Sequence, residues 1–154
     1  MRHVTVLLNE TVAGLLPKSG GVYVDGTLGA GGHTEEICRV APKSTIIGID
    51  ADADAIERAK ARLAGMPCTL ITSTNFNDKI SEILDENRID EVDGVLLDLG
   101  MSSDQLDRSG RGFSFLRDEP LKMTMQSEIS TNDLDAYKII NNFPGLIHIG
   151  LAFN

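Results

Sequence analysis

The stretch from Val22 to His33, VYVDGTLGAGGH, limits the possible folds of this chain more than any other part of the sequence. A short run of β-branched and aromatic residues ends at Asp25, and four glycines follow at once. The next residues, His33 to Val40, have helix-forming content, with acids early and an arginine late. Strand, glycine turn and helix together predict a nucleotide-type cradle, where a Cβ would obstruct a closely approaching ligand. The alternative is an ordinary glycine-rich turn.

Short apolar runs alternate with amphipathic segments along the first hundred residues. After the strand at 22–24, further strands are predicted at 45–49, 68–71 and 92–100. Helices are predicted at 10–16, 33–40, 53–64, 77–87 and 133–142, the first capped by Asn9 and the third by Asp52. This alternation predicts an α/β fold with a parallel sheet, whose ligands bind outside the carboxyl ends of the strands.

Four residues are expected at that carboxyl edge: Asp25, Asp50, Phe76 and Asp98. Asp50 lies 19 positions after Gly31, close to the spacing at which an acid binds the ribose hydroxyls of an adenosine ligand. Phe76 offers an apolar face for adenine, although it is equally compatible with a core phenylalanine. Asp98 is either part of the site or a cap at the end of its strand.

The loop departs from the dinucleotide pattern GxGxxG, because Thr34 stands where the third glycine is expected. No basic residue is near to pair with a pyrophosphate, whereas three aspartates suit a cationic ligand. These features favour S-adenosylmethionine, which combines an adenosine with a positive sulfonium and has no phosphate. His33 is a candidate contact, its alternative being a polar neighbour of the turn.

Composition restricts the class of partner and the environment. A net charge of -9, with 23 acids against 14 bases, opposes general attraction to phosphate backbones, so an RNA partner requires a local basic patch. Cys38 and Cys68 lack CxxC spacing, and we expect two free thiols in a reducing compartment and no zinc site. The absence of a signal-like start or a long apolar run predicts a soluble, cytoplasmic protein with no membrane partner.

Five motifs together resemble one family, the bacterial ribosomal RNA small-subunit methyltransferase H, also called MraW. The motifs are HVTVLLNE (3–10), DGTLGAGGHT (25–34), GIDADADAI (48–56), DGVLLDLGMSSDQLD (93–107) and RGFSFLRDEPL (111–121). The resemblance implies a Rossmann-like class I methyltransferase fold with about four parallel strands and flanking helices. It covers an N-terminal portion in residues 1–121, and residues 122–154 form a divergent tail.

The resemblance also implies a reaction and a site. The reaction is S-adenosylmethionine-dependent methylation of N4 of a cytidine in the decoding region of small-subunit ribosomal RNA. The family's cofactor positions match Gly31, Gly32, His33, Asp50, Phe76, Asp98 and Gln105. Gln105 enters through the resemblance alone. Asp98, or a carbonyl just after it, is the best placed proton acceptor. Basic residues of the following loop are candidates for RNA phosphate contacts, the alternative being a solvated loop; they are Arg108, Arg111, Arg117 and Lys122.

Two features set this chain apart from the family pattern. Where the family continues DMRMD after Leu121, this chain has KMTMQ, from Lys122 to Gln126. The apolar residues 146–153 have no counterpart, and are either an added strand or an out-of-frame end. Three functions therefore compete: an active methyltransferase, a catalytically impaired S-adenosylmethionine-binding remnant, and a dinucleotide-dependent oxidoreductase. Thr34 and the five motifs disfavour the third.

Overall fold

We describe the chain from a computed structural model, which covers residues 7–100, 109–114, 116–126 and 135–142. The chain divides into two compact units, Met1–Gly100 and Met101–Asn154. The domain limits drawn from the resemblance, 1–121 and 122–154, stay a prediction.

The first unit is built on a four-stranded parallel sheet, which confirms the α/β prediction. In spatial order its strands are β3 (Thr69–Thr74), β2 (Thr45–Asp50), β1 (Val22–Asp25) and β4 (Gly94–Leu96). Strand β4 is shorter than the predicted 92–100. Its neighbour β1 ends at Asp25, so beyond Leu96 the chain meets the glycine loop instead of a strand, and the Asp98 N–H donates to the Thr27 hydroxyl at 2.7 Å.

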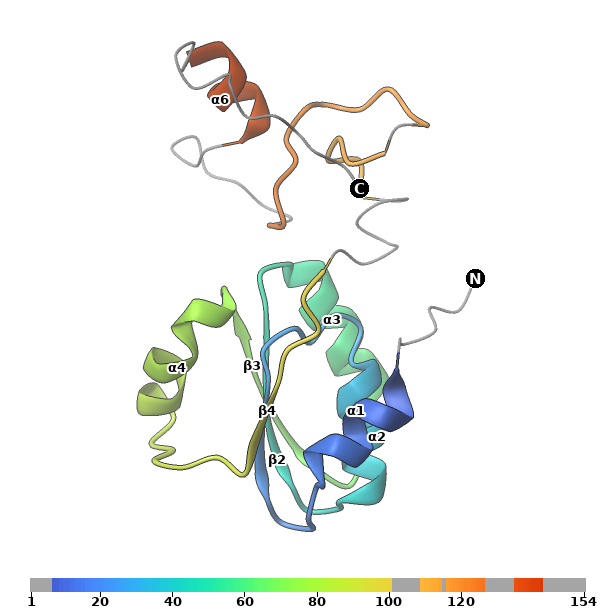
Figure 1. Cartoon of the computed structure of the whole chain (residues 1–154), viewed down its shortest axis with the longest axis vertical. Coiled ribbons are helices and arrows are strands. Elements are labelled where there is room, and N and C mark those ends of the chain that lie inside the picture. Colours follow the sequence, from blue (N-terminus) through green and yellow to red (C-terminus); the bar gives the residue numbers. More distant parts are fainter. Residues whose placement is uncertain (1–6, 101–108, 115, 127–134, 143–154) are drawn as a thin grey trace. The chain divides into compact units, whose positions relative to one another are not determined.

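Helices cover both faces of this sheet. They are α1 (Leu8–Leu15), α2 (Gly32–Val40), α3 (Ala53–Leu63) and, after the 3-10 turn η1 (Asn77–Lys79), α4 (Ile80–Glu86). Figure 1 shows α4 on one side of the sheet and α1, α2 and α3 on the other. This three-layer arrangement leaves the carboxyl ends of the strands as the edge from which the loops emerge.

Alternation along the strands divides the core between the two faces. On the face covered by α1 and α2, Tyr23 and Ile46 pack with Ile37 in one buried cluster. On the opposite face, Val24 and Ile47 pack with Ile83 of α4. The central strand β2 is buried on both faces over its four middle residues, as a continuous apolar run predicts.

One of the two predicted helix caps is confirmed. Asp52 precedes α3 in an extended conformation, and its carboxylate accepts a hydrogen bond from the Asp54 N–H at 3.0 Å. Asn9 is not a cap, because α1 begins at Leu8 and its N-cap is Leu7, at φ 50°. The α1 prediction was therefore wrong at its start, although the helix itself is present.

Replacing Asp52 by alanine should lower the free energy of unfolding by about 1 kcal/mol, because the Asp54 N–H loses its acceptor. Urea denaturation followed by circular dichroism measures the change. Asp52→Asn is the matched control, since its side-chain oxygen can still cap α3. Its free energy of unfolding should fall by only about a few tenths of a kcal/mol. Equal losses in both variants would contradict a capping role.

The two cysteines form a disulfide, so the prediction of free thiols was wrong. Cys38 lies on α2 and is fully buried, Cys68 immediately precedes β3, and their Cα atoms are 5.4 Å apart. The pairing of β2 with β3 brings these segments together, and the Thr69 N–H donates to the Ser44 carbonyl at 2.8 Å. The two cysteines are 30 residues apart in the sequence, so no local sequence pattern indicates that they pair.

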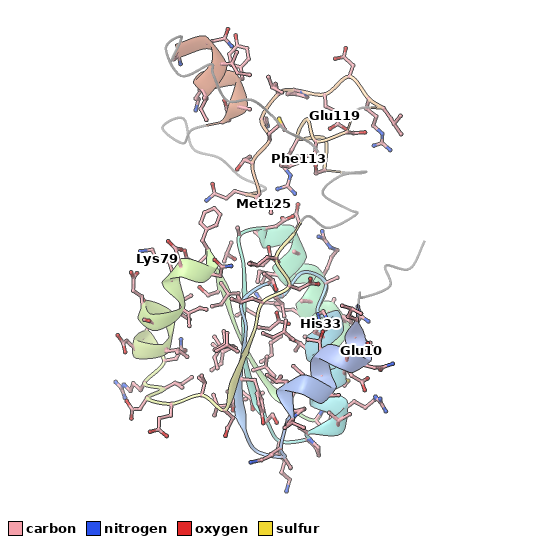
Figure 2. The ribbon with its side chains drawn as sticks, in the orientation of Figure 1. Glu10, His33, Lys79, Phe113, Glu119 and Met125 are labelled. Carbon is pink, nitrogen blue, oxygen red and sulfur yellow. A yellow bond between two sulfur atoms is a disulfide. The ribbon has the colours of Figure 1, made fainter. Side chains whose placement is uncertain are left out.

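The second unit contains helix α6 (Ala136–Asn142), which falls within the predicted helix 133–142. Arg111 is buried, and its guanidinium donates to the carbonyls of Thr124 and Met125. The Gly112 N–H donates to the Glu119 carboxylate at 2.9 Å; Glu119 and Met125 are labelled in Figure 2. Arg111 therefore holds its own loop together through these two hydrogen bonds, and its contact with RNA phosphates stays a prediction.

Arg117 and Lys122 are exposed, whereas Arg108 lies outside the described residues, as does the tail at 146–153. Within the part of the chain that the structure describes, no helix has the length and apolar character needed to cross a membrane.

Candidate functional site

The glycine loop after β1 is held in place by backbone contacts to its neighbours. The Leu28 N–H donates to the Ile49 carbonyl at 2.9 Å, and the Gly31 N–H donates to the Leu28 carbonyl at 2.8 Å. Gly31 has φ 77°, and a Cβ there would lie 3.1 Å from Leu63 Cδ1 and 3.3 Å from Ala59 Cβ. Its backbone conformation therefore favours glycine, and its packing against α3 leaves little room for a Cβ.

Asp50 joins this loop to the end of β2. One carboxylate oxygen, Oδ2, accepts a hydrogen bond from the Gly29 N–H at 2.7 Å, and the other, Oδ1, accepts from the Asp52 N–H at 2.9 Å. The predicted convergence of the glycine loop and Asp50 is thus present in the structure. The hydrogen bond to Gly29 is a second role for Asp50, which the spacing alone did not indicate.

Beneath the loop lies a buried polar cluster that sequence reasoning identified only in part. Asp25 is 1% exposed, and its two oxygens accept hydrogen bonds from the Thr27 N–H at 3.2 Å and the Thr34 hydroxyl at 2.8 Å. His33 is 5% exposed, and its Nε2 has no hydrogen-bond partner among the described residues. Figure 2 shows His33 on the side of the sheet that carries α1. Thr34, first noted because it stands where a third glycine was expected, is the hydrogen-bond donor to a buried carboxyl.

Burial raises the pKa of the Asp25 carboxyl above its ordinary value of 3.8. Hydrogen bonds from Thr34 and Thr27 and the charge of His33 oppose this shift, while the negative charge of Asp50 adds to it. Asp25 consequently holds its proton to higher pH in the folded protein than in the unfolded chain.

This shift makes stability depend on pH through Asp25. The carboxyl favours the folded state fully at pH below 3.8, and that contribution is lost as pH rises through the raised pKa. Asp25→Asn removes the titration, so the stability of the variant relative to wild type should increase with pH across this window and then level off. Urea unfolding at a series of pH values measures the difference. Asp54→Asn, at an exposed position, is the control; a pH-independent difference for Asp25→Asn would contradict the shift.

The remaining predicted residues at the carboxyl edge are exposed. Phe76 is 47% exposed, so the core alternative is wrong for this residue. Phe76 follows Asn75, whose backbone N–H donates a hydrogen bond to the Asp50 carbonyl at 2.9 Å. This bond brings the backbone just before Phe76 close to Asp50. Asp98 has an exposed side chain, and its N–H bond to Thr27 links the end of β4 to the glycine loop. Gln105 lies outside the described residues.

These residues fit an adenosine ligand that carries a positive charge. A Cβ at Gly29 would point into open space, with only the Thr27 carbonyl within reach at 3.9 Å, so the loop is accessible there. The candidate contacts are the exposed side chains of Phe76 and Asp98, the Asp50 carboxylate, and His33, whose Nε2 has no hydrogen-bond partner among the described residues. No group of three potential metal ligands occurs within the described ranges.

Comparison with known proteins connects this geometry to a family. The model of a family described as the MraW methylase family matches residues 1–147. Two curated relatives from Clostridium botulinum, strains Hall and Okra, are each called ribosomal RNA small subunit methyltransferase H and are 48% and 47% identical to this chain over 143 residues. Each match covers 92% of this chain and 45% of the relative, so the chain spans less than half the length of these relatives.

Two solved structures are similar to parts of this chain. The C-terminal domain of precorrin-6Y C5,15-methyltransferase from Rhodobacter capsulatus is 20% identical, with a TM-score of 0.49 over 74% of this chain and 60% of that chain. An rRNA methylase from Streptococcus thermophilus is 19% identical, with a TM-score of 0.39 over 54% of this chain and 49% of that chain.

Proposed function

This chain belongs to the MraW methylase family, and from that membership we propose that it binds S-adenosylmethionine and methylates small-subunit ribosomal RNA. The observation that carries the cofactor proposal is the 2.7 Å hydrogen bond between the Gly29 N–H and Asp50, since it brings the glycine loop and the candidate ribose acid into one site. The finer proposal is that the methyl group goes to N4 of a cytidine in the decoding region. A ribosomal substrate implies a cytoplasmic location.

The proposed cofactor contacts divide along the site. Gly31, Gly32 and His33 would hold the methionine part, and Asp50 would bind the ribose hydroxyls. Phe76 would lie against the adenine ring, and its exposed face supports this role. Asp98 and Gln105 complete the set.

When bound, S-adenosylmethionine supplies an electrophilic methyl group on a positively charged sulfur. The amino nitrogen of cytosine is a weak nucleophile because its lone pair is drawn into the ring, so the protein must align it and accept its proton. The proposed acceptor is the Asp98 carboxylate or a backbone carbonyl just after it: the Asp98 side chain is exposed, and its backbone N–H donates to the Thr27 hydroxyl beside the glycine loop.

The second candidate function is a catalytically impaired S-adenosylmethionine-binding remnant of this family. It is favoured by residues 122–126, KMTMQ, where the family pattern is DMRMD. The loss of two acids and an arginine from this segment would affect substrate binding or catalysis without affecting Asp50 or the glycine loop.

Two measurements separate the candidates. Calorimetry with S-adenosylmethionine and with NAD tests the ligand, and we expect binding of the first alone. Transfer of tritium from labelled S-adenosylmethionine to undermethylated small subunits tests the reaction, and mapping of the labelled nucleotide tests the N4-cytidine proposal. Binding without transfer would favour the remnant, and failure to bind S-adenosylmethionine would overturn both candidates.

A further inference from the structure

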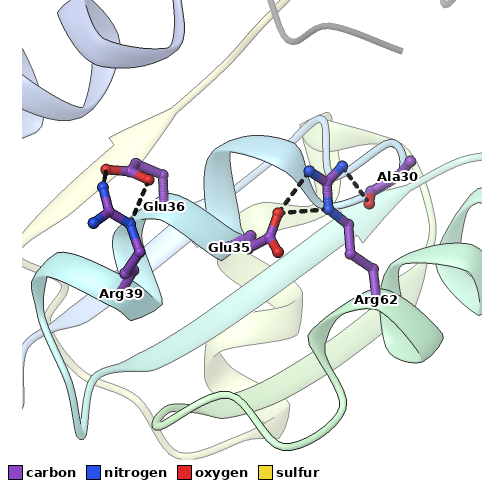
Figure 3. A network of polar contacts seen from close by, with 5 residues as sticks. All are labelled: Ala30, Glu35, Glu36, Arg39 and Arg62. Atoms are coloured by element: carbon purple, nitrogen blue, oxygen red, sulfur yellow. Dashed lines mark hydrogen bonds and ion pairs between the residues drawn. The ribbon is translucent and has the colours of Figure 1, made fainter. Parts of the chain in front are cut away.

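Arg62, in the last turn of α3, makes contacts that neither the motifs nor the comparisons single out. Its guanidinium reaches back to Glu35 in the first turn of α2, with Nε at 2.7 Å and Nη2 at 2.6 Å from the same carboxylate oxygen. Its Nη1 points to the Ala30 carbonyl of the glycine loop, at 3.5 Å (Figure 3). One side chain thus bridges α3, α2 and the loop between β1 and α2.

This ion pair differs in sequence separation from the other ion pairs found among the described residues of the same unit. Three others, Glu36–Arg39, Glu57–Lys60 and Lys79–Glu82, join residues three positions apart. Arg62 and Glu35 are 27 positions apart, and their side chains are only 31% and 36% exposed. Partial burial reduces solvent screening, and the contact fixes two segments of the chain that local helix geometry does not hold together.

Arg62 acts on the same part of the loop as its helical neighbours. Ala59 and Leu63, which flank it on α3, form the surface against which Gly31 packs so closely that a Cβ would be 3.1 to 3.3 Å from them. Ala30, held by Arg62, immediately precedes Gly31. Helix α3 therefore fixes the Ala30–Gly31 end of the loop by both packing and polar contacts, next to the start of α2 at Gly32 and His33.

The other end of the loop has a separate support. Gly29 is held by the Asp50 carboxylate, which is in turn fixed by the Asp52 N–H. The proposed ribose contact therefore depends on Asp50, whereas the proposed methionine contacts, at Gly31, Gly32 and His33, lie beyond Ala30. This division predicts that the two ends of the cofactor site can be perturbed independently.

We propose that Arg62 is a positioning residue that holds the Ala30–Gly31 segment and the first turn of α2 in the conformation that binds the methionine end of S-adenosylmethionine. This inference rests on the proposed function. Arginine suits the role because its planar fork donates in several fixed directions at once, and lysine cannot reproduce both contacts.

The test compares two ligands on the full chain. S-adenosylmethionine contacts both ends of the site, whereas 5′-methylthioadenosine has the adenosine part but no amino acid part. For Arg62→Ala, calorimetry should show the dissociation constant of S-adenosylmethionine raised by roughly three- to tenfold, because preorganisation of the loop is lost. The constant for 5′-methylthioadenosine should change by less than about twofold, since contacts at the ribose end remain.

Matched variants separate positioning from general stability. Lys60→Ala removes an exposed ion pair from the same helix that does not touch the loop, and it should leave both constants unchanged. Arg62→Lys keeps the charge opposite Glu35, and should restore part of the affinity for S-adenosylmethionine only. If Arg62→Ala does not fold, the test uses Arg62→Lys. The ratio of its dissociation constant for S-adenosylmethionine to that for 5′-methylthioadenosine should then exceed the wild-type ratio.

The outcomes distinguish this inference from the function on which it rests. Wild-type protein that fails to bind S-adenosylmethionine would overturn the proposed function and the role of Arg62 together. Wild-type binding with an unchanged ratio of the two constants in the Arg62 variants would overturn the role of Arg62 alone. Equal weakening of both ligands is one form of this outcome, because a general loss of structure affects both ends of the site and leaves the ratio unchanged.

Discussion

Asp50→Ala is expected to weaken S-adenosylmethionine binding at least about tenfold, equivalent to about 1.4 kcal/mol, by removing the proposed partner of the ribose hydroxyls. The structure adds a second reason for a large effect. The carboxylate also accepts hydrogen bonds from the Gly29 and Asp52 N–H groups, so the variant leaves two backbone donors without their acceptor. Isothermal calorimetry measures the dissociation constant.

Asp50→Asn is the matched control for this prediction. Its side-chain oxygen can serve one of the two backbone donors, so binding should be weakened less than in the alanine variant. S-adenosylmethionine and 5′-methylthioadenosine both contain the ribose, so Asp50→Ala should weaken the binding of both ligands. The Arg62 variants, in contrast, should weaken the binding of S-adenosylmethionine only. A folded Asp50→Ala protein with the wild-type dissociation constant would contradict the ribose assignment.

Local signals in the sequence were sufficient for the sheet and for much of the candidate site. The apolar run of β2 predicts a strand that is buried on both faces, and the four middle residues of β2 are buried in the structure. Asp52 predicts the start of α3 because capping depends only on the next few residues. Asp25 and Asp50 end neighbouring parallel strands, so the topology alone brings them to one edge. Their roles toward a cofactor stay predictions.

Features that depend on contacts between distant segments could not be predicted. Glu35 and Arg62 each read as an ordinary charge on a helix surface, and only the packing of α2 beside α3 brings them together. Arg111 was one of four candidates for RNA phosphate contacts, and the sequence does not reveal that its guanidinium donates to the carbonyls of Thr124 and Met125. Strand β4 was drawn too long because the length of its partner β1 decides where pairing ends.

The prediction of free thiols was the largest error of the sequence interpretation. The disulfide found in its place should make a large contribution to the free energy of unfolding. Reduction of Cys38–Cys68 should lower the free energy of unfolding by about 3 to 4 kcal/mol, because the bond closes a loop with a sequence separation of 30 and constrains the unfolded chain. Urea denaturation of wild-type protein with and without a reductant measures this loss, and the midpoint should fall on reduction.

A doubly substituted protein, Cys38→Ala with Cys68→Ala, provides the control. It should be less stable than oxidised wild type, and reductant should not change its midpoint, because no bond remains to be broken. Thiol titration of wild-type protein, denatured without reductant, is the direct test of the bond itself. Fewer than about 0.2 thiols per chain are expected if Cys38 and Cys68 are paired, since a disulfide persists on unfolding without a thiol to exchange with it. Recovery of both thiols would show that α2 and the start of β3 are held together by packing alone.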